Sequence, residues 1–361
     1  MKNRTFLIKP VSSNCNLMCK YCFYVDVSEH REIKSNGIMT YETMQLLIDK
    51  ALRETEHIIA FAFQGGEPTL AGLSYFEAFV QYVETNKKST QRVSYSIQTN
   101  GILLDDAWCS FFHKYNFLIG ISLDGYQENH DYFRMTASKS PTYKSVMKSI
   151  AVLRKYEVEF NILTVLSAQL AKHPEKLYNF YKEQNFSYIQ LIPCLSGLDE
   201  KRNEYSLTPK LFASFYKLFY DLWLEDYKKG RYLSVTLFDN IIPLFIGIPP
   251  YQCGTLGQCN PQLVVESNGG VYPCDFYVLD KYYGGNIKSM ELDTIENCSA
   301  FSIFKEEGKT TKRLCSLCEF RKICNGNCKR INSVFLEENY CGYQDFLQHA
   351  ASSMSQIAKK I

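Results

Sequence analysis

The chain of 361 residues lacks the features that define several broad classes of protein. It has no apolar run of the roughly 18 residues that a membrane span requires, so we expect no membrane insertion. Its 40 Lys and Arg nearly balance 38 Asp and Glu, which argues against a dedicated nucleic-acid or membrane-surface binder. Residues 1–10 are polar and charged, without the apolar segment of a signal peptide. We therefore expect a cytoplasmic protein.

What the chain has is a globular composition, 46% hydrophobic, and 14 cysteines. In the reducing cytoplasm, clustered cysteines more often bind metal than form disulfides. Most of these cysteines lie between residues 253 and 341. We therefore expect metal centres, one of them in a cysteine-rich C-terminal region.

Up to about residue 195, short apolar runs alternate with segments of helical periodicity. We expect strands at residues 6–11, 58–63, 93–98, 117–123, 158–166 and 188–193. We expect helices at residues 40–55, 74–86, 105–116, 142–155 and 170–184. Apolar strands separated by helices predict an α/β fold with a parallel sheet, and six units instead of eight predict a partial (β/α)6 TIM-like barrel. Its chemistry should lie at the carboxyl ends of the strands.

Local signals mark several helix starts. Thr40 is expected to cap the helix that follows it, and Ser74 with Glu77 forms a capping box. Thr208 and Pro209 predict the start of a helix that ends at Gly230.

After Gly230 the alternation stops. A hairpin is expected from residues 262–266 and 271–274, and a final amphipathic helix at residues 345–361. We therefore divide the chain into a barrel domain with a connecting helix, residues 1–230, and a small loop-rich domain, residues 231–361. With so little regular structure, the second domain should be held together largely by its ligands.

The first cysteine motif, Cys15-Asn-Leu-Met-Cys19-Lys-Tyr-Cys22, directly follows the first expected strand. Three thiolates on one loop can hold three irons of a 4Fe-4S cluster and leave the fourth open to another ligand. The alternative is a zinc site, but structural zinc usually has four closed ligands in CxxC pairs. The spacing therefore favours a cluster.

This motif in a six-unit βα chain resembles the radical S-adenosylmethionine (radical SAM) enzymes. The run Gln64-Gly-Gly-Glu-Pro68 after the second expected strand is similar to the family's GGEP segment, which receives the methionyl amine of the cofactor. The resemblance implies reductive cleavage of S-adenosylmethionine to methionine and a 5′-deoxyadenosyl radical, which abstracts hydrogen from carbon. The protein then has to bind and orient the cofactor and the substrate, and it has to exclude competing reactions.

A second set of cysteines occupies the C-terminal region. Its spacing, Gly-x4-Cys followed by CxxC-x5-C-x3-C and a last Cys, resembles the SPASM domain with two auxiliary 4Fe-4S clusters; zinc knuckles are the alternative. The resemblance implies one cluster on Cys253, Cys259, Cys274 and Cys328, and another on Cys315, Cys318, Cys324 and Cys341. With the first motif this makes three 4Fe-4S clusters. Cys109, Cys194 and Cys298 remain as ordinary thiols.

Longer runs resemble the anaerobic sulfatase-maturating enzymes over nearly the whole chain. These runs are Cys22-Phe-Tyr24, residues 61–72, Gln98-Thr-Asn-Gly101, Ser122-Leu-Asp-Gly125 and residues 272–280. The resemblance implies oxidation of a Cys or Ser in a sulfatase to Cα-formylglycine. The partners it implies are an unfolded or nascent sulfatase with a Cys/Ser-x-Pro-x-Arg motif and an electron donor such as flavodoxin or ferredoxin.

The same resemblance implies roles for single residues. Tyr21, Gly66, Ser122, Arg134 and Leu195 would contact S-adenosylmethionine, and Asp275 would be the catalytic base. Each has an ordinary alternative: packing for Tyr21, a turn for Gly66, a cap or solvated loop for Ser122 and Arg134.

Asp275 also has a chemical argument. After hydrogen abstraction from the substrate Cβ, the hydroxyl or thiol must lose its proton, so a carboxylate has to reach that group. An Asp next to a cluster ligand is held in place, and the negative field of the cluster should raise its proton affinity. The alternative is an exposed Asp in the turn after the hairpin.

Two other functions fit parts of the pattern. A SPASM maturase that forms thioether links in ribosomal peptides would share the clusters, but many carry an N-terminal recognition domain, and only 14 residues precede Cys15. An electron carrier would prefer four protein ligands for each cluster, which the CxxxCxxC motif does not provide.

Overall fold

The computed structural model describes residues 2–199, 202–307 and 313–361. By their contacts the residues form two compact units. The first contains residues 1–122, 131–160 and 261–306, and the second contains residues 123–130, 161–260 and 307–361. These units are built from interleaved parts of the chain, and the division at residue 230 stays a prediction.

The first unit is built on a mostly parallel sheet. Its parallel strands are β1 (Arg4–Ile8), β2 (Ile58–Phe63), β3 (Arg92–Thr99) and β4 (Leu118–Ser122), in that order. Beyond β1 lie β8 (Leu263–Val265), β9 (Gly270–Tyr272) and β10 (Gly285–Asn286). The expected hairpin, β8 and β9, is confirmed, but its parallel pairing to β1, with Phe6 opposite Leu263, was not expected.

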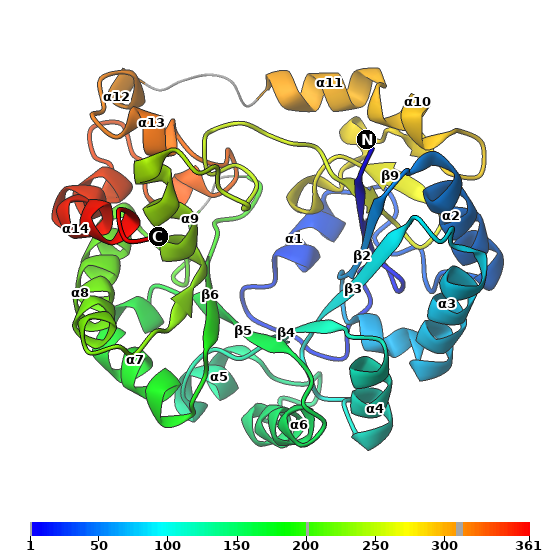
Figure 1. Ribbon diagram of the computed structural model, residues 1–361, viewed down its shortest axis with the longest axis horizontal. Helices are drawn as coiled ribbons and strands as arrows, with labels where there is room; N and C mark the ends of the chain where they lie inside the picture. The colour runs from blue at the N-terminus through cyan, green and yellow to red at the C-terminus, as the bar shows by residue number, and fades with distance from the viewer. Residues whose placement is uncertain (1, 200–201, 308–312) are drawn as a thin grey trace. The chain divides into compact units, whose positions relative to one another are not determined.

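The first unit also contains helices. They are α1 (Phe23–Glu29), α2 (Tyr41–Glu54), α3 (Leu73–Asn86), α4 (Asp106–Lys114), α6 (Tyr143–Lys155), α10 (Leu292–Glu296) and α11 (Ser299–Glu306), with 3-10 turns η1 (Pro68–Ala71), η4 (Asp275–Tyr277) and η5 (Asp280–Tyr282). Figure 1 shows α2 and α3 along the outer side of β2 and β3. The core between them is aromatic: Phe63 contacts Phe76 at 4.9 Å and Phe79 at 5.0 Å between ring centroids. This packing fixes the carboxyl ends of β1 to β3, where the site lies.

The second unit continues the alternation with β5 (Phe160–Leu166), β6 (Tyr188–Pro193) and the short β7 (Ser234–Val235), paired in parallel in that order. Its helices are α7 (Pro174–Glu183), α8 (Pro209–Lys228), α9 (Thr236–Ile241), α12 (Arg313–Ser316), α13 (Arg321–Cys324) and α14 (Gly342–Ala358), with 3-10 turns η2 (Leu170–Lys172), η3 (Ile242–Ile246) and η6 (Asn332–Val334). Helix α5 (Gln127–Phe133) crosses the boundary between the units. Long α8 packs against α14, with Tyr216 and Phe346 at 5.6 Å.

The six expected strands are confirmed, whereas two helix starts differ from expectation. Thr40 caps α2 as predicted, accepting a hydrogen bond from the Thr43 amide at 3.2 Å, and Thr208 caps α8. The Ser74 capping box is wrong, because the chain turns at Gly72 (φ +85°) straight from η1 into α3. The helix expected at residues 170–184 is interrupted at His173, since Pro174 has no N–H to continue the preceding turn.

None of the described helices is both long enough and apolar enough to cross a bilayer.

Candidate functional site

The first cysteine motif lies on the loop after β1, and the end of β2 holds that loop in place. The Gly66 amide donates to the Ser12 carbonyl at 3.0 Å, and the Glu67 amide donates to the Asn14 carbonyl at 2.8 Å. A Cβ on Gly66 would lie only 1.9 Å from the Asn14 oxygen. Glycine is therefore required here because two stretches of backbone meet, and the alternative of an ordinary turn does not describe this contact.

Glu67 ties the ends of β2 and β3 together. Its buried carboxylate accepts hydrogen bonds from the Thr99 hydroxyl at 2.7 Å and the Asn100 amide at 2.7 Å, besides two from Thr69. Burial raises the Glu67 pKa, while these hydrogen bonds work against the rise. The Asn100 side chain in turn donates to Asn16 Oδ1, within the cysteine loop, at 2.7 Å. Glu67 and Asn100 both lie in runs that carry the family resemblance, but the sequence alone does not reveal this link between the strands.

Among the thiols of the motif, Cys15 is strongly affected by its surroundings. Desolvation of the Cys15 sulfur raises its pKa to about 11, and the nearby Glu67 and Cys22 add to this, while Arg134 lowers it. Such a thiol is protonated in the metal-free chain and loses its proton when it binds iron. The Arg134 charge would favour that ionised form.

Two of the predicted cofactor residues lie beside this loop. The Arg134 guanidinium is 5.5 Å from the centre of the Tyr21 ring, and that ring lies 5.2 Å from Phe133. Backbone hydrogen bonds join the two segments, from the Met18 amide to Met135 and from the Lys20 amide to Phe133. Tyr21, Gly66 and Arg134 are thus brought together around the cysteines.

The other two predicted cofactor residues lie elsewhere. Ser122 is the last residue of β4, at the carboxyl end where a ligand-binding group is expected. Leu195 follows β6 in the second unit, and its carbonyl accepts from the Ser206 hydroxyl at 3.4 Å. Their contacts with a cofactor stay predictions.

Asp275 begins the 3-10 turn η4 after β9 and is buried in a cluster of polar side chains. Lys9 Nζ lies 2.9 Å from Asp275 Oδ1, and the Tyr24 hydroxyl donates to Oδ2 at 2.7 Å. Only 14% of the Asp275 side chain is exposed. The alternative of an exposed turn residue is therefore wrong.

The lysine that contacts Asp275 also faces a second carboxylate. Burial would raise the pKa of Glu266, yet the positive charges of Lys9 and Arg31 outweigh it and lower that pKa, and Arg31 contacts Glu266 at 2.7 Å. Charges therefore alternate from Asp275 through Lys9 and Glu266 to Arg31. Lys9 was not among the predicted site residues, although a lysine at the end of an apolar strand is itself a signal.

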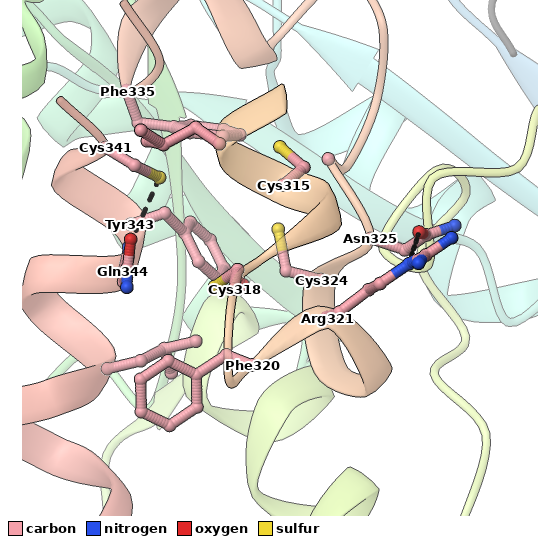
Figure 2. Close-up of a pocket in the computed structure, with 13 residues that line it drawn as sticks. Cys315, Cys318, Phe320, Arg321, Cys324, Asn325, Phe335, Cys341, Tyr343 and Gln344 are labelled. Atoms are coloured by element: carbon pink, nitrogen blue, oxygen red, sulfur yellow. Dashed lines mark hydrogen bonds between the residues drawn. The ribbon is translucent and has the colours of Figure 1, made fainter. Parts of the chain in front are cut away.

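Four cysteines of the second set converge in the second unit. Cys315, Cys318, Cys324 and Cys341 line one pocket of about 370 Å³, together with Phe335, Tyr343 and Leu347 (Figure 2). Burial raises the pKa of Cys324 to about 12, and the other three thiols add to it. This is the set that sequence analysis assigned to one cluster.

The pocket fits a cluster better than a single ion. Among the described residues, no three Cys, His, Asp or Glu side chains converge on one point as the ligands of one metal ion do. In a 4Fe-4S cluster each thiolate binds a different iron, so thiols spread around a cavity suit it.

The other predicted set is divided between the units. The loop that carries Cys253 and Cys259 runs close against the segment of Cys328: a Cβ on Gly254 would lie 2.7 Å from the Cys328 Cβ. Cys274 belongs to the first unit, directly before Asp275. The four-residue set stays a prediction. Of the unassigned thiols, Cys109 and Cys194 are buried, and burial raises the pKa of each to about 12, which suits inert core residues.

Comparison with known proteins adds the family context. Residues 10–181 match the Radical SAM superfamily, and residues 253–319 match the iron-sulfur cluster-binding domain called SPASM. The chain is 38% identical to a cysteine-type anaerobic sulfatase-maturating enzyme of Clostridium novyi, with 100% of this chain and 99% of that protein covered. It is 31% identical to a serine-type enzyme of Bacteroides thetaiotaomicron, with 98% and 91% covered.

Solved structures are similar to this chain over the same length. The structure described as native anSMEcpe with bound AdoMet has a TM-score of 0.93 at 37% identity, covering 99% of this chain and all of that one. A likeness in fold alone extends to Streptococcus suis SuiB, at a TM-score of 0.64 and 16% identity, covering 94% of this chain and 77% of that one. The predicted fold class, a partial barrel followed by an iron–sulfur domain, is confirmed.

Proposed function

This chain belongs to the anaerobic sulfatase-maturating enzymes of the radical SAM superfamily, and on that premise we propose how its residues act. It is an iron–sulfur oxidoreductase that uses S-adenosylmethionine to oxidise a Cys or Ser of a sulfatase to Cα-formylglycine. The observation that carries the proposal is the buried Asp275 carboxylate, held by Lys9 and Tyr24.

The oxidation of a substrate Cys removes two hydrogens from its Cβ–S group. When bound, the first cluster and S-adenosylmethionine supply a 5′-deoxyadenosyl radical, which takes one hydrogen atom from Cβ. The second hydrogen leaves as a proton from sulfur and one electron, and the auxiliary clusters, when bound by the C-terminal cysteines, would supply the acceptor for that electron. Water then replaces the sulfur as hydrogen sulfide and gives the aldehyde. A Ser substrate gives the aldehyde directly.

Asp275 is proposed to take that proton. Lys9 Nζ lies 2.9 Å from one carboxylate oxygen, and the Tyr24 hydroxyl donates to the other, so both oxygens are held in place. Burial strongly raises the Tyr24 pKa, and the neighbouring Asp275 adds to this, so Tyr24 stays a donor. The carboxylate is thereby held in one orientation.

The chain's own groups would hold the cofactors as follows. Cys15, Cys19 and Cys22 would bind the first cluster, and Gly66 would bring backbone groups close to it. Tyr21, Ser122, Arg134 and Leu195 would contact S-adenosylmethionine. The eight C-terminal cysteines would bind the auxiliary clusters in the two sets predicted above.

The partners proposed are an unfolded sulfatase segment with a Cys/Ser-x-Pro-x-Arg motif and a flavodoxin- or ferredoxin-like electron donor. We place the reaction in the cytoplasm, because clustered free thiols and oxygen-sensitive clusters suit a reducing compartment.

The decisive experiment is an anaerobic assay with reconstituted clusters, dithionite, S-adenosylmethionine and either a Cys-x-Pro-x-Arg or a Ser-x-Pro-x-Arg peptide. We expect formylglycine by mass spectrometry, with 5′-deoxyadenosine released. If both peptides stay unchanged, with or without release of 5′-deoxyadenosine, the proposed substrate is contradicted. A thioether product from a peptide with further cysteines would instead favour the ribosomal peptide maturases.

Asp275→Asn tests the base directly. The variant should still cleave S-adenosylmethionine, but formylglycine should fall by a factor of about 100 or more, in the usual range for loss of a general base. Asp280→Asn, an exposed carboxylate five residues further on, is the matched control and should behave as wild type. Full product formation by Asp275→Asn would remove Asp275 from the mechanism.

A further inference from the structure

Tyr343, the second residue of α14, has a buried hydroxyl without a hydrogen-bond partner among the described residues. The residue is only 2% exposed. Buried hydroxyls nearly always have a partner, because leaving one unpaired costs free energy. The metal-free chain therefore lacks an acceptor for this hydroxyl.

The surroundings of Tyr343 indicate which acceptor is missing. Its ring packs between Phe335 at 5.1 Å and Phe212 at 5.8 Å, so its orientation is fixed. It lines the pocket of Cys315, Cys318, Cys324 and Cys341, and Figure 2 shows it among those side chains. Thiolate and sulfide sulfurs in that pocket would be charged acceptors, which form the stronger hydrogen bonds.

A second cavity of about 450 Å³ also borders Tyr343. Its lining includes the neutral polar residues Thr236, Gln252 and Asn327, yet none of them accepts from the Tyr343 hydroxyl. It offers no charge comparable to that of four thiolates. The cysteine pocket is therefore the better source of the acceptor.

We propose that the Tyr343 hydroxyl donates a hydrogen bond to a sulfur of the cluster held by Cys315, Cys318, Cys324 and Cys341, and that this bond raises the reduction potential of that cluster. The proposal rests on the function proposed above. A cluster becomes more negative on reduction, so a donor at its sulfur stabilises the reduced form. Tyr343 thus acts on electron transfer through the cluster that its hydroxyl contacts.

The test is Tyr343→Phe, which removes the hydroxyl and keeps the ring. EPR-monitored redox titration of the full-length protein, in a C15A/C19A/C22A background that removes the first cluster, should show one auxiliary midpoint at a more negative potential. Iron content should be unchanged. Tyr216→Phe is the matched control, because Tyr216 is similarly buried but lines the second cavity and not the cysteine pocket, and it should leave both midpoints unchanged.

Activity gives an independent readout in the enzyme with all its clusters. Tyr343→Phe should lower kcat for formylglycine while KM for the peptide stays the same, because acceptance of the electron follows substrate binding. A structural defect would instead lower iron content or raise KM.

Two results would overturn the proposal. The first is an unchanged pair of midpoints in a Tyr343→Phe protein with full iron. If that variant loses iron, 3,5-difluorotyrosine at position 343 keeps the ring and donates a stronger hydrogen bond, so the midpoint should move to a more positive potential; no movement is the second overturning result. These potentials need no substrate, so they stand apart from the peptide assay, whose failure would contradict the proposed function instead.

Discussion

At the scale of single residues, the site depends on buried charges that neutralise one another. Asp275 and Glu266 are both close to Lys9, and Arg31 forms a second ion pair with Glu266. Removing one partner of a buried pair leaves the other charge uncompensated, which is more costly than the pair itself is stabilising. The series therefore makes the position of the proposed base sensitive to residues that never touch the substrate.

Glu266→Gln should reveal this sensitivity as a pH-dependent loss of stability. At pH 7 we expect it to lower the free energy of unfolding by about 3 kcal/mol, because Arg31 and Lys9 lose a buried counter-charge. The Glu266 pKa is lowered in the folded chain, so its contribution is complete above the unfolded value of about 4.3 and is lost as pH falls through the folded value.

The measurement is urea unfolding of wild type and variant in matched buffers from pH 7 to pH 3. The difference between them should be constant above about pH 4.3 and should shrink below it. A difference that grew with acidity would contradict the charge assignment.

At the scale of elements, two neighbouring helices begin in different ways. A Thr40 side chain caps α2, whereas Gly72 leads into α3 without any side-chain cap. Thr40→Ala should therefore cost about 1 kcal/mol of stability, since the Thr43 amide loses its acceptor. Ser74→Ala is the control: despite the capping-box sequence, it should change stability by less than about 0.5 kcal/mol. Thermal unfolding of both variants checks this, and equal losses would show that Ser74 does cap α3.

At the scale of the whole molecule, the C-terminal segment has little regular structure of its own. Between residues 313 and 341 the described elements are the short α12, α13 and η6, while four cysteines surround one pocket. Cluster binding should therefore contribute directly to folding of this segment.

Cys324→Ala should remove roughly a third of the iron, one of three clusters, and lower the melting temperature of the protein. Cys298→Ala should leave the iron content unchanged, because Cys298 lies outside every predicted ligand set. Iron analysis and calorimetry of the two purified variants check this. Equal iron in Cys324→Ala and wild type would contradict the assignment of this pocket.

The sequence alone indicated the six strands of the barrel and the grouping of Cys315, Cys318, Cys324 and Cys341, because periodicity and cysteine spacing are local in the chain. The reaction followed from the resemblance of longer runs to a known family. Asp275 was singled out by the family resemblance and by its position beside Cys274, and its role as the base stays a prediction. Only the tertiary structure placed Lys9 and Tyr24 on that carboxylate and paired the hairpin with β1, since these residues are distant in sequence. It also showed that Glu67 links the ends of β2 and β3 by hydrogen bonds and that only glycine fits at position 66. Both findings depend on backbone segments that meet at the edge of the sheet. Sequence motifs indicate which chemistry the residues can carry out, but contacts between distant segments form only when the chain folds.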